Sequence, residues 1–139
     1  MEKDLRSIIH PEVAVDLTSK TGANTTTVGN IIDTDGFDGV DFIIRADNLQ
    51  SGLITPLLED GDNSALSDAV AVDDAYIIGA DGVETGQEAA AALDADGVSH
   101  IGYVGKKRYV RLSLVSTLGP TGDISAEAIL GFPRNAPTV

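Results

Sequence analysis

The sequence contains no cysteine, no tryptophan and no long apolar run, and each absence excludes a class of protein or site. Without cysteine, neither a disulfide nor a thiolate metal site holds the fold, and the redox compartment is not readable from the chain. No apolar run approaches the ~18 residues that a membrane-spanning helix requires, so we expect no membrane partner. The N-terminal residues Met1–Arg6 lack the apolar segment of a signal peptide, and we therefore expect synthesis in the cytoplasm.

Positive charge is scarce and unevenly distributed. The 139 residues include 22 acidic and nine basic side chains, which give a formal net charge of −13. Between Ala46 and Gly105 there are twelve acidic residues and neither lysine nor arginine. Such a surface repels phosphates and argues against nucleic acid as a partner. Two interpretations stay open: a solvated face that keeps the protein soluble, or an acidic body whose basic patch docks on an acidic partner.

Residues able to carry catalysis or bind a metal form no complete motif. His10 and His100 lie ninety residues apart, and no Gly-x-Ser-x-Gly elbow supports a Ser-His-Asp grouping. The segments 33–38 and 60–64 resemble fragments of calcium loops, but the glycine is misplaced and the final Glu is missing. Asp-rich β-turns have the same composition. We therefore expect no enzymatic activity, no catalytic residues, no cofactor and no metal site.

Apolar and polar residues alternate with a period of two, which is typical of half-buried strands. The clearest runs are Val13–Leu17, Val40–Ala46, Val110–Leu114 and Ile124–Phe132, and further strands are expected at 25–32, 53–58, 75–79 and 98–104. One short helical segment, or a loop, is expected at Gln87–Leu93. About eight short strands separated by turns predict an all-β protein, an antiparallel β-sandwich of the jelly-roll type.

The two ends of the chain lack this alternation. We expect an N-terminal arm at residues 1–12, a sandwich domain at 13–132 and an extended C-terminal tail at 133–139, where two prolines occur. These arms are either frayed termini or segments that a neighbouring subunit orders.

Residues 100–111, His-Ile-Gly-Tyr-Val-Gly-Lys-Lys-Arg-Tyr-Val-Arg, hold four of the nine basic residues. The pattern predicts two strands joined as a hairpin, with Gly105 supplying a positive φ at the turn. A second hairpin is expected at Gly119–Gly122. We hypothesise that the basic segment binds a partner through Lys106, Lys107, Arg108, Tyr109 and Arg111. The alternative is a solvated turn.

The run Gly102–Arg111 resembles a Gly-Tyr-x-Gly-x-x-Arg-Tyr-x-Arg phrase in the C-terminal half of a family of small tailed-phage virion proteins. In that family a strand, a Gly/Thr-rich turn and a last apolar strand follow, and Leu112–Ser116, Leu118–Gly122 and Ile124–Phe132 are similar. The resemblance covers about residues 98–137. Leu58–Ser64 is similar to the family's middle turn, but Leu66 stands where an aromatic residue is often found. Residues 72–97 have no counterpart.

These phage proteins resemble capsid decoration, or cement, proteins. The resemblance implies a non-enzymatic virion protein that binds the major capsid protein on the outer capsid surface, stabilises the head and forms a homotrimer. The symmetry axis it occupies, the host, and whether it trimerises before docking stay open. A neck or tail component is an alternative within the virion. A carbohydrate-binding β-sandwich module is the alternative from another class, although the chain has few aromatic residues for stacking on sugars.

Overall fold

The computed structural model describes residues 4–79 and 92–135. Within them the chain forms the strands β1 (Ile9–Thr21), β2 (Thr26–Thr27), β3 (Ile31–Asp33), β4 (Phe37–Gln50), β5 (Leu53–Gly61), β6 (Val70–Ala71), β7 (Ile77–Ile78), β8 (Gly97–Tyr103), β9 (Tyr109–Thr117) and β10 (Thr121–Pro133), with a short 3₁₀ helix, η1 (Asp74–Tyr76), before β7. The described residues contain no helix long and apolar enough to cross a membrane.

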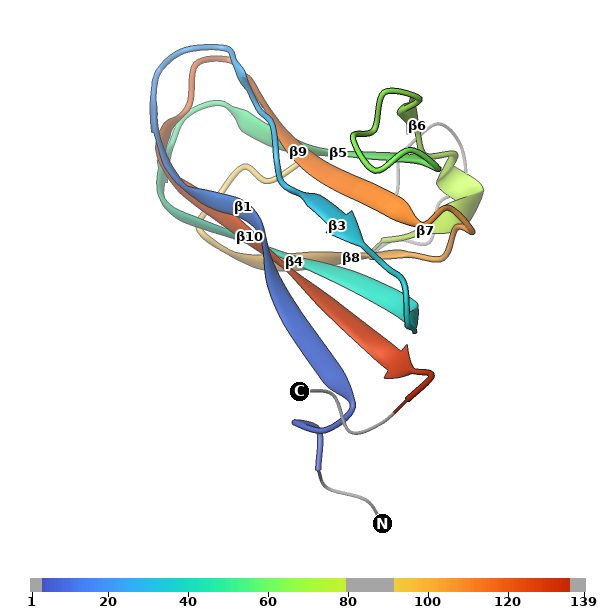
Figure 1. The fold of residues 1–139 in the computed structure, drawn as a ribbon. Coiled ribbons are helices and arrows are strands. Elements are labelled where there is room, and N and C mark those ends of the chain that lie inside the picture. The colour runs from blue at the N-terminus through green and yellow to red at the C-terminus, as the bar shows by residue number, and fades with distance from the viewer. Residues whose placement is uncertain (1–3, 80–91, 136–139) are drawn as a thin grey trace.

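The strands form two facing antiparallel sheets (Figure 1). Sheet A has the order β1-β10-β4-β8-β7, and sheet B has the order β2-β9-β5-β6, with β3 also paired to β9. The pairing is nested, because β1 pairs with β10, β2 and β3 with β9, and β4 with β8. This nested double sheet is the jelly-roll arrangement, so the predicted fold class is confirmed.

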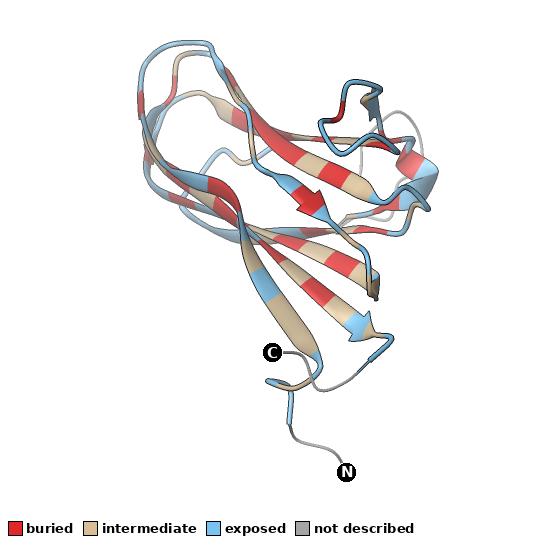
Figure 2. Cartoon of the chain, in the orientation of Figure 1, coloured by how far each residue is buried: buried red, intermediate tan, exposed pale blue. Residues whose placement is uncertain are grey.

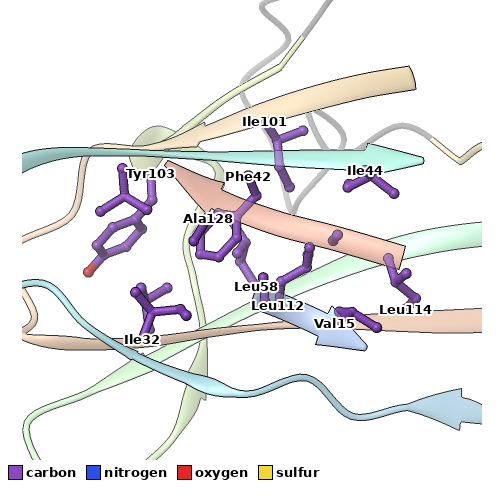
Figure 3. Packing of buried hydrophobic residues seen from close by; sticks show 14 of the residues in the cluster. Val15, Ile32, Phe42, Ile44, Leu58, Ile101, Tyr103, Leu112, Leu114 and Ala128 are labelled. Carbon is purple, nitrogen blue, oxygen red and sulfur yellow. The ribbon is translucent and has the colours of Figure 1, made fainter. Parts of the chain in front are cut away.

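The core lies between the sheets, as Figures 2 and 3 show. The predicted alternation holds along β4 and most of β9 and β10, with exceptions at Ser113 and Phe132. The inward side chains of these strands are fully or almost fully buried: Val40, Phe42, Ile44, Ala46, Val110, Leu112, Leu114, Ile124, Ala126, Ala128 and Leu130. Ile54 and Leu58 of β5 and Ile101 of β8 complete the cluster. Each of the Val, Leu, Ile and Phe side chains among them stabilises the fold by roughly 1.5–3 kcal/mol through removal from water.

Both predicted hairpins are wrong, because each turn joins strands of different sheets. β8 belongs to sheet A and β9 to sheet B, so residues 104–108 cross from one sheet to the other. β9 and β10 are likewise divided between the sheets, and Gly119–Gly122 lies in or beside that second crossing. Turn residues predict that the chain changes direction, but they do not predict which sheet the next strand joins.

In β1 the predicted inward face is also wrong for two of its three residues. Val13 and Leu17 are exposed, whereas Ala14 and Val15 are both buried. Register shifts between Val13 and Val15 and between Val15 and Thr18 interrupt the pairing with β10. An extra residue at each bulge reverses the facing of the residues that follow, so strict alternation fails. At the first bulge, the Asn30 side-chain amide donates to the Val13 carbonyl oxygen, and the Asn30 backbone N–H donates to the Ala14 carbonyl oxygen.

The boundaries of the sandwich differ from those expected at both ends. β1 begins at Ile9, so residues 9–12 of the expected N-terminal arm are paired with β10. β10 ends at Pro133, and the Arg134 backbone N–H donates to the carbonyl oxygen of Gly36. The expected helix at 87–93 lies mostly outside the described residues, and at its end Leu93 forms an isolated antiparallel bridge with Ile54.

Candidate docking surface

The basic segment, residues 105–108 with Arg111, is paired with acidic residues of the same chain. Lys107 Nζ lies 2.7 Å from Asp62 Oδ2. Arg108 donates through Nε and Nη2 to the two carboxylate oxygens of Asp33, both at 2.9 Å. Arg111 Nη2 donates to Glu59 Oε1 at 3.0 Å, between residues directly opposite on β9 and β5. Arg111 and Glu59 thus form an ion pair across the two neighbouring strands.

Two of these pairs, Arg108 with Asp33 and Lys107 with Asp62, change the pKa of at least one member. The hydrogen bond from Arg108 holds the pKa of Asp33 below its usual value, and Asp33 in turn raises the pKa of Arg108. The hydrogen bond to Asp62 raises the pKa of Lys107. All of these side chains are substantially exposed, so each pair adds little to stability. Their assignment as a partner-binding surface remains a prediction.

Tyr103 stabilises the connection from β8 to β9 through two hydrogen bonds of its hydroxyl. Its hydroxyl donates to Asp60 Oδ2 at 2.6 Å and accepts from the Lys107 backbone N–H at 3.1 Å. Burial, together with Asp60, raises the pKa of the phenol well above its usual value. Gly105 does not have the positive φ that we predicted. It is required for space instead, since a Cβ atom there would lie 2.4 Å from the Tyr103 hydroxyl.

The two Asp-rich segments that resemble calcium loops have their carboxylates engaged in these contacts. Asp35 lies within 4 Å of Arg108 and of Arg134, while Asp33, Asp60 and Asp62 are bonded as described above. Among the described residues, no three histidine or acidic side chains gather in a way that would hold a metal ion. His10 stacks on Phe37, and His100 Nδ1 lies 2.9 Å from Asp41 Oδ2 on the outer face of sheet A.

That outer face carries an apolar groove that the sequence analysis did not identify. The groove has a volume of about 880 Å³. Gly79 lines it, and three strand glycines, Gly39 of β4, Gly102 of β8 and Gly131 of β10, place bare backbone in it. Gly39 and Gly131 are directly paired. Large apolar side chains that are between 42% and 78% exposed surround them: Leu5, Ile8, Ile78, Val98, Val104 and Phe132.

Phe132 has an unusual conformation within this groove. Alternation along β10 predicts that it points inward, but the structure leaves it 78% exposed. Its φ is +51°, in the left-handed region that an aromatic residue rarely adopts. The ring lies against Gly39, where a Cβ atom would be 2.7 Å from Phe132 Cδ2. Strained backbone of this kind concentrates at functional sites, so it marks the groove as a candidate site.

The turn before β1 brings two of the groove residues into place. Asp4 accepts from the Ser7 backbone N–H and hydroxyl, and the Ile8 backbone N–H donates to the Leu5 carbonyl. Leu5 and Ile8 then line the groove together with Ile9. Two signals in the sequence could have revealed the site: the glycines inside strand patterns, and the apolar Ile129 at an outward position of β10.

Comparisons with known proteins place the chain in no family. No protein-family model matches it, and no curated protein matches its sequence. A structure of Bacillus endospore appendages that form disulfide-linked pili matches with a TM-score of 0.48 and 11% identity, over 94% of each chain. The SPBc2 prophage-derived protein YomS matches with a TM-score of 0.39 and 13% identity, over 87% of this chain and 94% of its own.

The VP2 subviral particle of infectious bursal disease virus matches with a TM-score of 0.48 and 13% identity, over 93% of this chain and 33% of its own. At these scores and identities the comparisons assign no activity and no partner to this chain.

Proposed function

We propose that this protein is a non-enzymatic structural component of a phage virion, and specifically a capsid decoration protein that forms a homotrimer on the outer capsid surface. The observation that carries the proposal is the apolar groove on the outer face of sheet A. The resemblance of residues 98–137 to small tailed-phage virion proteins supports the proposal that the partner is a phage capsid.

The composition of the groove supports docking to another protein, since large apolar side chains there stay exposed to water. Contiguous exposed apolar surface on a jelly roll is a feature of protein interaction sites. The six exposed apolar side chains around the three glycines contribute little to the core that holds the fold. A sugar site would pair stacking aromatic rings with several hydrogen-bonding groups. This groove has one exposed ring, Phe132, and few polar neighbours such as Asp41 and His100, which disfavours the carbohydrate alternative.

The stabilising action would be mechanical. A protein that binds the assembled capsid and not its separated subunits stabilises the assembly by mass action. Many copies bridging neighbouring capsid subunits would add binding free energy at interfaces strained by packaged DNA.

Purified particles of the phage whose genome encodes this chain provide the test. Mass spectrometry should detect the protein in stoichiometric amounts, and a reconstruction should place trimers on the outer surface with sheet A facing the shell. Particles that lack the protein, combined with specific binding on a glycan array, would replace this proposal with the carbohydrate-binding alternative. Isolated, non-touching copies on the shell would refute the trimer.

A further inference from the structure

The outer face of sheet A has a second hollow beside the groove, and charged side chains alternate there with apolar ones such as Val13 and Leu17. This hollow, of about 520 Å³, is lined by four carboxylates, those of Asp16, Asp47, Asp123 and Glu127, and by the single basic residue Arg45. We call it the acidic hollow. It continues along the strands that form the groove, because Ile129 and Glu127 are successive outward residues of β10.

The strand register gives the distance from the middle of the groove to the far row of the acidic hollow. The outward row Pro11, Ile129, Asp41, Gly102 and Ile78 crosses the groove, and the row Asp123–Asp47 lies in the acidic hollow. These rows are six residues apart along β10, or roughly 20 Å at a rise of about 3.3 Å per residue. A partner segment of about six to eight extended residues would therefore contact both hollows at once.

Among the described basic residues, Arg45 alone lines the acidic hollow, where it faces four carboxylates. Lys107, Arg108, Arg111 and Arg134 are paired with carboxylates elsewhere in the chain. Lys20 is buried and donates to the hydroxyls of Thr25 and Thr27. A second copy docking by the same face would also bring together two proteins of net charge −13, and like charges repel.

We propose that the outer face of sheet A binds one continuous segment of a different protein, whose apolar residues fill the groove and whose neighbouring lysines or arginines contact the acidic hollow. The inference rests on the proposed function in one respect, namely that a capsid subunit would supply this segment. The chemistry of the segment follows from the two hollows alone. Apolar contacts give the affinity, and the carboxylates fix the direction in which the segment lies.

A displayed library of random twelve-residue peptides tests the chemistry without any phage particle. Selection on the wild-type protein should enrich peptides in which a cluster of apolar residues adjoins two or more basic residues. The variant Phe132→Asn should lower the affinity of a selected peptide roughly tenfold or more, as truncation of a central aromatic anchor does. Leu118→Asn is the matched control, because Leu118 is also exposed and also has a positive φ, but it lies in the connection from β9 to β10.

Charge variants test the other half of the face. Asp47→Asn combined with Glu127→Gln should weaken binding of the selected peptide and reduce its dependence on salt. Asp73→Asn with Asp94→Asn removes the same charge from residues that line neither hollow and should change neither quantity, since Asn keeps the cap that Asp73 provides for η1. Enriched peptides without basic residues, a peptide that binds Phe132→Asn as tightly as wild type, or no enrichment at all would each overturn the inference. Any of these results would leave particle binding, and so the proposed function, to be judged separately.

Discussion

Replacing Phe132 by Asn should leave the free energy of unfolding almost unchanged, although it removes a large aromatic side chain. Two effects of similar size oppose each other. An aromatic side chain offers roughly 200 Å² of surface. Phe132 is 78% exposed, so burial of the rest contributes only about 1 kcal/mol at ~25 cal/mol per Å². The left-handed backbone conformation costs a residue other than Gly or Asn about 1–2 kcal/mol, and Asn relieves that cost.

The expected net change is therefore below about 1 kcal/mol in either direction, whereas Phe42→Ala in the core should cost about 3–5 kcal/mol. Urea unfolding followed by circular dichroism measures both variants, and Leu118→Asn should behave like Phe132→Asn because its φ is +60°. A loss of more than about 2 kcal/mol for Phe132→Asn, with an unchanged denaturant slope, would show that Phe132 is a structural residue. The strain at this position would then give no evidence for a docking role.

Three further predictions concern the rest of the molecule. Gly122→Ala should destabilise the fold by about 2 kcal/mol or more, because φ is +136° there and a Cβ atom would lie 2.7 Å from the Asn48 carbonyl oxygen; thermal unfolding checks this. Unfolding free energy should fall as the pH drops below about 4, since the pKa of Asp33 is lower in the folded state than its usual value of 3.8, and the slope should flatten in Asp33→Asn. Lys106→Glu should lower binding to undecorated particles without changing the unfolding midpoint; unchanged occupancy would mean that the basic segment is a solvated turn.

Alternation predicted most of the core, because burial on one face imposes a period of two wherever a strand is regular. Phe42 and Leu112 illustrate this success, and both are fully buried. The prediction failed where the backbone departs from regularity. The bulges in β1 turned Val13 outward, and the positive φ of Phe132 did the same at the end of β10. Neither event has a residue signature that distinguishes it from a regular strand.

The partners of the basic segment were not predictable for a different reason. Arg108 and Asp33 are 75 residues apart in the chain, and they meet only because β3 and β9 pair in sheet B. With 22 acidic residues available, charge alone does not select the partner. The residue types in the segment predicted an ion-pairing surface, but only the topology of the sheets shows that the acidic side is supplied by the same chain.

The nested strand order has a consequence for how this protein reaches its folded state. β10, residues 121–133, lies between β1 and β4, so an interior strand of sheet A is synthesised after all the other described strands. Pairs such as Ile9 with Gly131 close nearly the whole chain into a loop, and contacts this distant in sequence make folding slow. Until β9 and β10 have been synthesised, β4 and β5 lack the strands that they pair with in the two sheets. Yield in the cell should therefore depend on temperature and chaperone supply more steeply than the stability of the finished protein would suggest.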